Sequence, residues 1–206
     1  MDLKNSWINF KVHDLKMRNI ILLILLQFSS LLFAQPGSLD NTFDNGPSAI
    51  TYGIIYSTII QPDGKIIVGG SFYSTSGKWV LNLTRLNPDG SLDMSFNTGT
   101  GANDTVKAIV LQPDGKIIIG GEFYNYNGTQ INRIARLNSD GSIDTSFNPG
   151  QGPNSDILNI SLQSDGKIII GGYLYTFNGT LINRMARLNT DGSLDTTFNL
   201  GIIPTN

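Results

Sequence analysis

Short apolar segments alternate with polar turns through most of the chain, and none of these segments has a helical period. One representative stretch predicts four antiparallel strands, at residues 106–111, 116–121, 133–138 and 142–147. Tight turns that contain Asp-Gly separate the first strand from the second and the third from the fourth, because glycine accepts the positive φ that such turns need. A polar and aromatic loop at residues 122–132 joins the second strand to the third. The pattern therefore predicts an all-β chain of small antiparallel sheets.

The same order of strands and turns returns with a period of 51 residues. The motif Gln-Pro-Asp-Gly-Lys-Ile-Ile-Ile-Gly-Gly at residues 112–121 has counterparts at residues 61–70 and 163–172, and a second motif starts at Gly37, Gly90, Gly141 and Gly192. A fixed period near fifty residues is typical of a solenoid or a propeller. Because Ile117, Ile118 and Ile119 are consecutive, the second strand is expected to be buried on both faces, which radially stacked four-stranded blades would achieve.

The number of motifs predicts an incomplete propeller. The repeats give three complete units, near residues 50–97, 105–148 and 156–199, and the fourth-strand motif occurs once more as an orphan at residues 38–43. Typical propellers have about four to eight blades. We therefore expect a β-propeller-type array that is an open partial propeller, whose exposed apolar ends take further blades or self-associate.

Three motifs together carry a resemblance to a known family. They are Gln-Pro-Asp-Gly-Lys-Ile-Ile-Ile-Gly-Gly, Ala-Arg-Leu-Asn-x-Asp-Gly-Ser and Leu-Asp-x-x-Phe-Asn, and they cover residues 37–199. In these motifs the chain resembles the delta-60 repeat of bacterial secreted proteins, which implies a β-propeller and carries over no catalytic residue. The apolar run before Gly-Gly is also similar to a kelch repeat. Since kelch units have a spaced Tyr and Trp after the glycines, and only the first unit here has a tryptophan there, Trp79, that similarity is one of architecture.

Residues 1–34 have the pattern of an N-terminal extension with a secretory signal peptide. Lys16 and Arg18 precede an apolar run at residues 20–26, and the small residue Ala34 follows. A membrane anchor is the alternative, but the apolar stretch is shorter than the roughly 20 residues that a membrane span needs. We expect cleavage after Ala34, no membrane span after cleavage, and a secreted or cell-surface protein.

The composition excludes several classes of chemistry. The net charge of −2 gives no basic surface for nucleic acid. The chain contains no cysteine, and its only histidine, His13, lies in the segment that cleavage would remove. Nucleophile systems that depend on His or Cys and the usual zinc sites are therefore excluded from the mature chain, and we expect neither a cofactor nor a metal.

Carboxylates remain as candidates for chemistry. Most of them repeat with the unit, which favours a structural role. The unrepeated ones are Asp44, Asp104, Glu122 and Asp156. A carboxylate-based glycoside-active enzyme needs two carboxyl groups, one of them with a raised pKa, and these residues leave that alternative open. The spacing of Asn138, Asp140 and Asp144 leaves open a calcium-stabilised adhesin repeat, while the structural interpretation is a hairpin turn in which Asp accepts backbone N–H bonds.

A repeated arginine has a predicted ionic partner in each unit. If residues 139–141 form a three-residue hairpin loop, Arg136 lies directly opposite Asp144. The three pairs predicted in this way are Arg85 with Asp93, Arg136 with Asp144, and Arg187 with Asp195. Oppositely charged residues at such positions stabilise a sheet, so we interpret these pairs as structural.

The loops after the second strands are the remaining candidates for ligand binding. In an up-and-down meander they lie on the face opposite the Asp-Gly turns. Their aromatic and amide side chains suit a sugar or a peptide, and packing between blades is the alternative role of the aromatics. The candidates are Tyr73, Trp79, Tyr124, Tyr126, Tyr175, Phe177, Asn127 and Asn178. The leading prediction is a secreted or cell-surface repeat module for binding or structural scaffolding, not an enzyme, whose partner is an unknown protein or glycan.

Overall fold

The computed structural model describes residue 43, residues 52–74 and residues 80–198. The signal peptide predicted at residues 1–34 lies outside the described residues, as do Asp44, Trp79 and most of the orphan strand predicted at residues 38–43. All the described residues belong to one compact unit, Thr42–Asn206. This part of the chain contains no helix that is long and apolar enough to cross a membrane.

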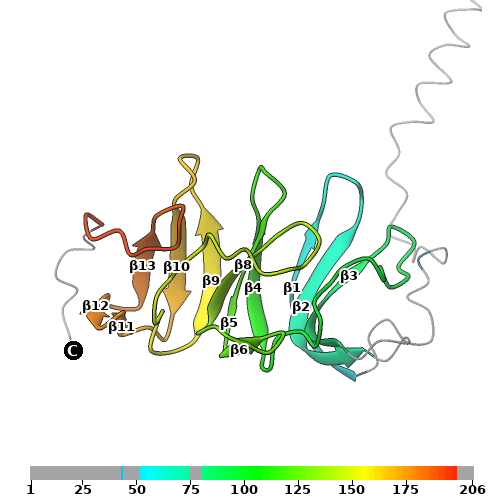
Figure 1. Ribbon diagram of the computed structural model, residues 1–206, viewed down its shortest axis with the longest axis horizontal. Helices are drawn as coiled ribbons and strands as arrows, with labels where there is room; N and C mark the ends of the chain where they lie inside the picture. Colours follow the sequence, from blue (N-terminus) through cyan, green and yellow to red (C-terminus); the bar gives the residue numbers. More distant parts are fainter. Residues whose placement is uncertain (1–42, 44–51, 75–79, 199–206) are drawn as a thin grey trace, which may run out of the picture. The chain divides into compact units, whose positions relative to one another are not determined.

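The described residues form three three-stranded antiparallel sheets, which lie one after another in chain order (Figure 1). Each of these sheets is called a blade below. Blade 1 consists of β1 (Tyr52–Ile60), β2 (Ile66–Ser74) and β3 (Val80–Leu86). Blade 2 consists of β4 (Val106–Leu111), β5 (Ile117–Gly121) and β8 (Ile134–Leu137). Blade 3 consists of β9 (Ile157–Leu162), β10 (Ile168–Gly172) and β13 (Met185–Leu188). The sheets are open rather than closed into one barrel, which confirms the predicted fold class.

The loop predicted after the second strand contains a short hairpin in blades 2 and 3. These hairpins pair β6 (Asn125–Tyr126) with β7 (Thr129–Gln130), and β11 (Thr176–Phe177) with β12 (Thr180–Leu181). At the corner of the first hairpin, Asn127 and Gly128 have φ values of 47° and 79°, as a two-residue Asn-Gly turn requires. The Asn-Gly dipeptide is visible in the sequence, so the prediction of a plain loop missed an available signal.

The fourth predicted strand is shorter than the sequence pattern indicated. In each blade it joins the third strand through a single bridge, at Leu86↔Leu92, Leu137↔Ile143 and Leu188↔Leu194. In blade 2 the chain then turns away from β8, because the N–H of Phe147 donates to the C=O of Asp144 at 3.2 Å and closes a turn. Each blade is therefore a three-stranded sheet with a single-bridge extension, not a full four-stranded sheet.

The hydrophobic core lies between adjacent blades. Ile117, Ile118 and Ile119 are all fully buried, so β5 is covered on both faces as predicted. One cluster combines Ile67 and Leu83 of blade 1 with Ile117 and Ile119 of blade 2. A second cluster combines Ile118 with the first two strands of blade 3. Because the two faces of one strand belong to different clusters, a blade is stabilised mainly by its neighbours.

Candidate binding grooves

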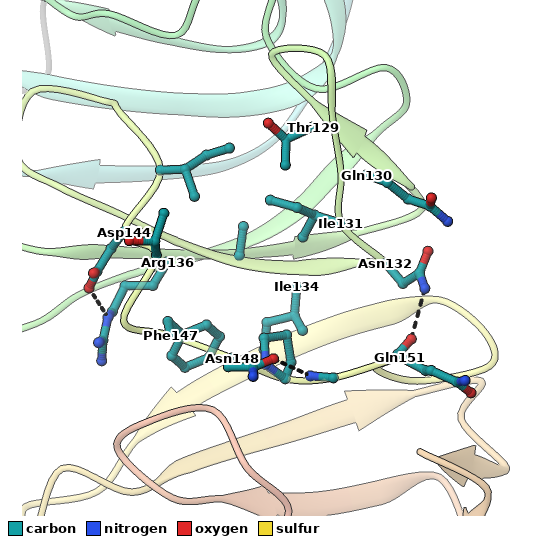
Figure 2. Close-up of a pocket in the computed structure, with 15 residues that line it drawn as sticks. Thr129, Gln130, Ile131, Asn132, Ile134, Arg136, Asp144, Phe147, Asn148 and Gln151 are labelled. Atoms are coloured by element: carbon teal, nitrogen blue, oxygen red, sulfur yellow. Dashed lines mark hydrogen bonds and ion pairs between the residues drawn. The ribbon is translucent and has the colours of Figure 1, made fainter.

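A cavity of about 440 Å³ lies along β8, the edge strand of blade 2 (Figure 2). Apolar side chains form much of its lining, and these are Ile131, Ile134, Ile143 and Phe147. At one end, Nε of Arg136 donates to Oδ2 of Asp144 at 2.6 Å. At the other end, Nδ2 of Asn132 donates to the backbone oxygen of Gln151 at 2.8 Å. The cavity, here called the blade 2 groove, is therefore apolar along its length and polar at both ends.

The groove exists because the fourth segment leaves the sheet early. The N–H of Asp144 donates to the C=O of Arg136 at 2.9 Å, and the chain then turns away. Beyond that point β5 is the only strand that pairs with β8 among the described residues. In an antiparallel strand the N–H and C=O of one residue face the same side. The N–H of Arg136 and the C=O of Ile134 consequently point toward the groove rather than toward β5.

Blade 3 has a groove at the same positions of the repeat. Its cavity is about 260 Å³, and residues 51 positions later replace those of blade 2: Ile182 for Ile131, Met185 for Ile134, Arg187 for Arg136 and Phe198 for Phe147. The rim differs, because Leu181 stands where blade 2 has Gln130. The groove is thus a property of the repeat, and its rim is what changes from blade to blade.

The structure brings together each of the predicted arginine–aspartate pairs. Nε of the arginine lies 2.8, 2.6 and 2.7 Å from Oδ2 of the aspartate in the pairs Arg85–Asp93, Arg136–Asp144 and Arg187–Asp195. A lysine that sequence analysis did not assign completes each site, since Nζ of Lys65, Lys116 and Lys167 lies within 2.6–2.8 Å of the same oxygen. These lysines recur every 51 residues, so their period was available as a signal.

The arginines also connect neighbouring blades. Nη1 of Arg85 donates to the backbone oxygen of Ser139 at 2.7 Å, and Nη1 of Arg136 donates to that of Thr190 at 2.6 Å. Each acceptor lies in the Asp-Gly turn of the following blade. The guanidinium carbon of Arg136 also lies 4.9 Å from the centre of the Phe147 ring. The charged end of the groove is therefore part of the contact that holds two blades together.

The environment of Asp144 keeps its carboxylate ionised. Burial raises the pKa of Asp144, but hydrogen bonds from Lys116 and Ser146 outweigh that effect, and the resulting pKa lies well below its usual range. The acid of a glycoside hydrolase needs the opposite shift. Asp144 is therefore suited to fix an arginine and a lysine, and it is not suited to donate a proton near neutral pH.

The unrepeated carboxylates that the structure describes each lie beside a donor. An oxygen of Glu122 lies 2.5 Å from Nζ of Lys107, and an oxygen of Asp156 lies 3.5 Å from Nε of Arg133. The side chain of Asp104 accepts the N–H of the next residue at 2.7 Å. Each of these carboxylates therefore has a local structural partner.

The Asp-Gly turn uses its carboxylates internally. Oδ1 of Asp140 accepts bonds from the N–H and the hydroxyl of Ser142 at 2.9 and 2.6 Å. Oδ1 of Asp144 accepts the same two kinds of bond from Ser146. The described residues contain no group of three or more His, Cys, Asp or Glu side chains that could hold a metal ion. These carboxylate oxygens accept backbone N–H bonds within the turn, as the interpretation of the motif as a hairpin turn requires.

The aromatic candidates divide into buried and exposed residues. Tyr126 and Phe177 are fully buried, so their assignment to a ligand surface was wrong. Oη of Tyr126 donates to the backbone oxygen of Gly141 at 2.8 Å, and burial raises the pKa of this phenol, which keeps it a donor. Tyr124 and Tyr175 are exposed. They remain available to a ligand, on the hairpin end of blades 2 and 3.

The other candidates serve mainly to hold the chain. The ring centre of Tyr73 lies 5.6 Å from that of Tyr52 on the adjacent strand. Asn127 and Asn178 occupy the corners of the two hairpins with positive φ. Oδ1 of Asn178 accepts the N–H of Gly152 at 2.9 Å, and Oδ1 of Asn127 accepts the N–H of Thr100 at 3.3 Å. These amides therefore help to fix the linkers between blades, and because both side chains are exposed, their predicted role as ligand contacts stays a prediction.

The chain matches a known protein family in each of its three repeats. A family model described as a domain of unknown function (DUF5122) beta-propeller matches residues 61–96, 112–147 and 163–198. Each matched segment starts at the glutamine after the first strand of a blade and ends at the phenylalanine after the single bridge of that blade. Together the three segments cover more than half of the chain. A comparison with curated proteins found no match.

Proposed function

The chain belongs to the DUF5122 β-propeller family, and we propose that it is a repeat module that binds an extended segment of a protein partner in its blade-edge grooves. The observation that carries this proposal is the recurrence of one groove in two successive blades. Apolar side chains along the groove would accept alternate side chains of the segment. The edge of β8 would pair with its backbone, as in other complexes where a peptide adds a strand to a sheet.

A glycan is the second candidate ligand, because amide side chains surround the polar end of the blade 2 groove. Two of these amides already have partners, since Asn132 donates to Gln151 and Asn148 accepts the N–H of Gly150. Groups that are used internally offer less to a sugar, which needs many hydrogen bonds. The internal use of these amides is why we favour the protein segment.

Selection of peptides against the purified chain, followed by calorimetric measurement of Kd, tests the proposal. Thr145 is exposed and lines the groove, so Thr145→Trp should fill it and raise Kd by about tenfold or more. Tyr124→Ala is the matched control, because Tyr124 is exposed outside the groove lining. If Tyr124→Ala weakens binding and Thr145→Trp does not, the ligand binds the exposed aromatic surface and the groove proposal fails. Binding of a glycan array and not of peptides would favour the second candidate.

We propose that this chain is not an enzyme. The ionic partners of Glu122 and Asp156 and the lowered pKa of Asp144 support this proposal, because the acid of a glycoside hydrolase needs a raised pKa. Turnover of a glycan that is abolished by Glu122→Gln would overturn it.

We also propose that the chain is a delta-60-type repeat protein of a bacterium and that residues 1–34 export it. The charged residues, the short apolar run and Ala34 support this proposal. N-terminal sequencing of the exported protein should give Gln35 as the first residue. An exported protein that still begins at Met1 or Met17 would contradict it.

A further inference from the structure

At each described junction between blades, side chains of the next blade pack directly against a glycine, here called the seat of that blade. A methyl group added at Gly69 would lie 2.7 Å from Cδ1 of Ile109 and 2.8 Å from Cγ1 of Val106. The same addition at Gly120 would lie 2.7 Å from Cδ1 of Ile160 and 2.8 Å from Cγ2 of Ile157. The two junctions are therefore built alike: two apolar side chains from the first strand of one blade rest on a bare backbone in the blade before it.

Among the described residues, the corresponding glycine of blade 3 has no such apolar neighbour. The nearest described atom to a methyl group at Gly171, beyond its chain neighbours, is the backbone oxygen of Arg184 at 3.9 Å. Beside the seat, Leu83 and Ile134 are fully buried in blades 1 and 2, whereas Met185, at the same position of the repeat, is 40% exposed. An apolar surface that the next blade covers in blades 1 and 2 is thus not covered by any described residue in blade 3.

The arginine of blade 3 is also more open than its counterparts. The side chains of Arg85 and Arg136 are 8% and 10% exposed, and both donate through Nη1 to a turn of the next blade. The side chain of Arg187 is 21% exposed, and its Nε bonds Asp195. The position equivalent to the acceptor Ser139, 51 residues earlier, is Pro88 in blade 1.

Blade 1 presents the complementary surface. Two of the hydrophobic clusters combine residues of two blades, whereas the third, made of Val68, Phe72 and Leu86, comes from blade 1 alone. Ile55, which stands 51 positions before Val106, is 50% exposed. Blade 1 thus holds one half of a blade junction and blade 3 holds the other half.

We propose that blade 3 of one copy seats blade 1 of a second copy, head to tail, with Ile55 resting on Gly171 and Nη1 of Arg187 donating to the backbone oxygen of Pro88. The occupant is a second copy because blade 1 carries Ile55 at the position of Val106 and the turn carbonyl of Pro88 at the position of Ser139. At the position of the second apolar contact, Ile109 in blade 2, blade 1 has Thr58. The two contacting surfaces differ, so successive copies form a ring or a filament rather than a symmetric dimer.

This association does not rest on the proposed ligand binding. The blade 2 groove is open although blade 3 is docked beside it, so a copy docked on blade 3 leaves the equivalent groove open too. Each added copy would present further grooves and increase the avidity for a repetitive ligand.

Sedimentation velocity of the full chain over a range of concentrations tests the association. The wild type should form species larger than a monomer. Gly171→Val fills an open seat, so it should fold normally by circular dichroism and weaken association by about tenfold or more. Ile55→Asp, at the other end of the molecule, should have the same effect. Gln130→Leu, on an exposed hairpin residue outside the interface, is the control and should associate like the wild type.

Mixing the two variants distinguishes this geometry from any other. Gly171→Val retains an intact blade 1 surface and Ile55→Asp retains an intact blade 3 seat, so an equimolar mixture should form a dimer that cannot grow. A wild type that stays monomeric would overturn the proposal, as would a mixture that stays monomeric while each variant is folded. If Gly171→Val fails to fold, Met185→Glu provides the same test of the seat.

Discussion

Gly120→Ala is the substitution that most directly tests how neighbouring blades hold each other. The added methyl group would lie 2.7 Å from Ile160 and 2.8 Å from Ile157. Both isoleucines are buried on β9, and Cβ of Ile157 is itself only 3.2 Å away, so rotation of that side chain cannot remove the overlap. The backbones of β5 and β9 must therefore move apart.

The expected loss follows from two opposing contributions. Excess volume in a packed core costs about 1–3 kcal/mol. Replacing a strand glycine by alanine recovers about 0.5–1 kcal/mol, because the unfolded chain loses less entropy. The net destabilisation should be about 1–2 kcal/mol. For a domain of this size such a loss lowers Tm by about 2–8 °C.

Thermal unfolding followed by circular dichroism measures the effect, and Gly171→Ala is the matched control. Gly171 has the same position in the repeat, but its methyl group would meet open space among the described residues. At protein concentrations too low for association, Gly171→Ala should leave Tm unchanged or raise it slightly. Equal Tm values for Gly120→Ala and Gly171→Ala would show that the blades are not packed as described, and the reasoning would be refuted.

Three further predictions concern single contacts. Arg136→Ala should lower the free energy of unfolding by about 2–4 kcal/mol, because it leaves the buried Asp144 with fewer partners. A double-mutant cycle with Asp144→Ala should show coupling above about 0.5 kcal/mol, and additive losses would mean that the side chains do not interact. The folded-state pKa of Asp144 lies below its unfolded value, so the stability that this carboxylate contributes is present above about pH 4 and is lost as the pH falls through the folded pKa. Denaturant unfolding at successive pH values should show a smaller loss of unfolding free energy between about pH 4 and pH 2 in Asp144→Asn than in the wild type. Parallel plots of unfolding free energy against pH would contradict this. Tyr126→Phe should cost about 1 kcal/mol in the same assay because the buried oxygen of Gly141 loses its donor, whereas Tyr124→Phe should cost nothing measurable, and equal effects would argue against that hydrogen bond.

Local chemistry made much of the blade predictable from the sequence. The Asp-Gly turns fix the register of the strands beside them, so the pairing of Arg136 with Asp144 could be counted from a three-residue loop. Three consecutive isoleucines predicted a strand buried on both faces, and the structure buries all three. The Asn-Gly hairpin corner was equally local and could have been found in the same way.

The candidate site could not be predicted at the same level. Tyr124 and Tyr126 are residues of one type in one loop, yet one is exposed and the other is fully buried. The difference arises because Tyr126 reaches the turn that contains Gly141, which lies 15 residues along the chain. The groove likewise depends on where the fourth segment leaves β8. That point is set by the turn in which the N–H of Phe147 donates to the C=O of Asp144 instead of continuing the pairing with β8.

The sequence by itself determined the repeat, the β class and the ionic pair within each blade, because these depend on residues that are close together in the chain. The tertiary structure alone decided which surfaces are covered, because coverage depends on contacts between residues about forty positions apart. Gly69, Gly120 and Gly171 occupy the same place in the repeated motif. Isoleucine and valine side chains of the following blade cover the first two, and no described residue covers the third in this way. Only the packing of whole blades distinguishes these glycines.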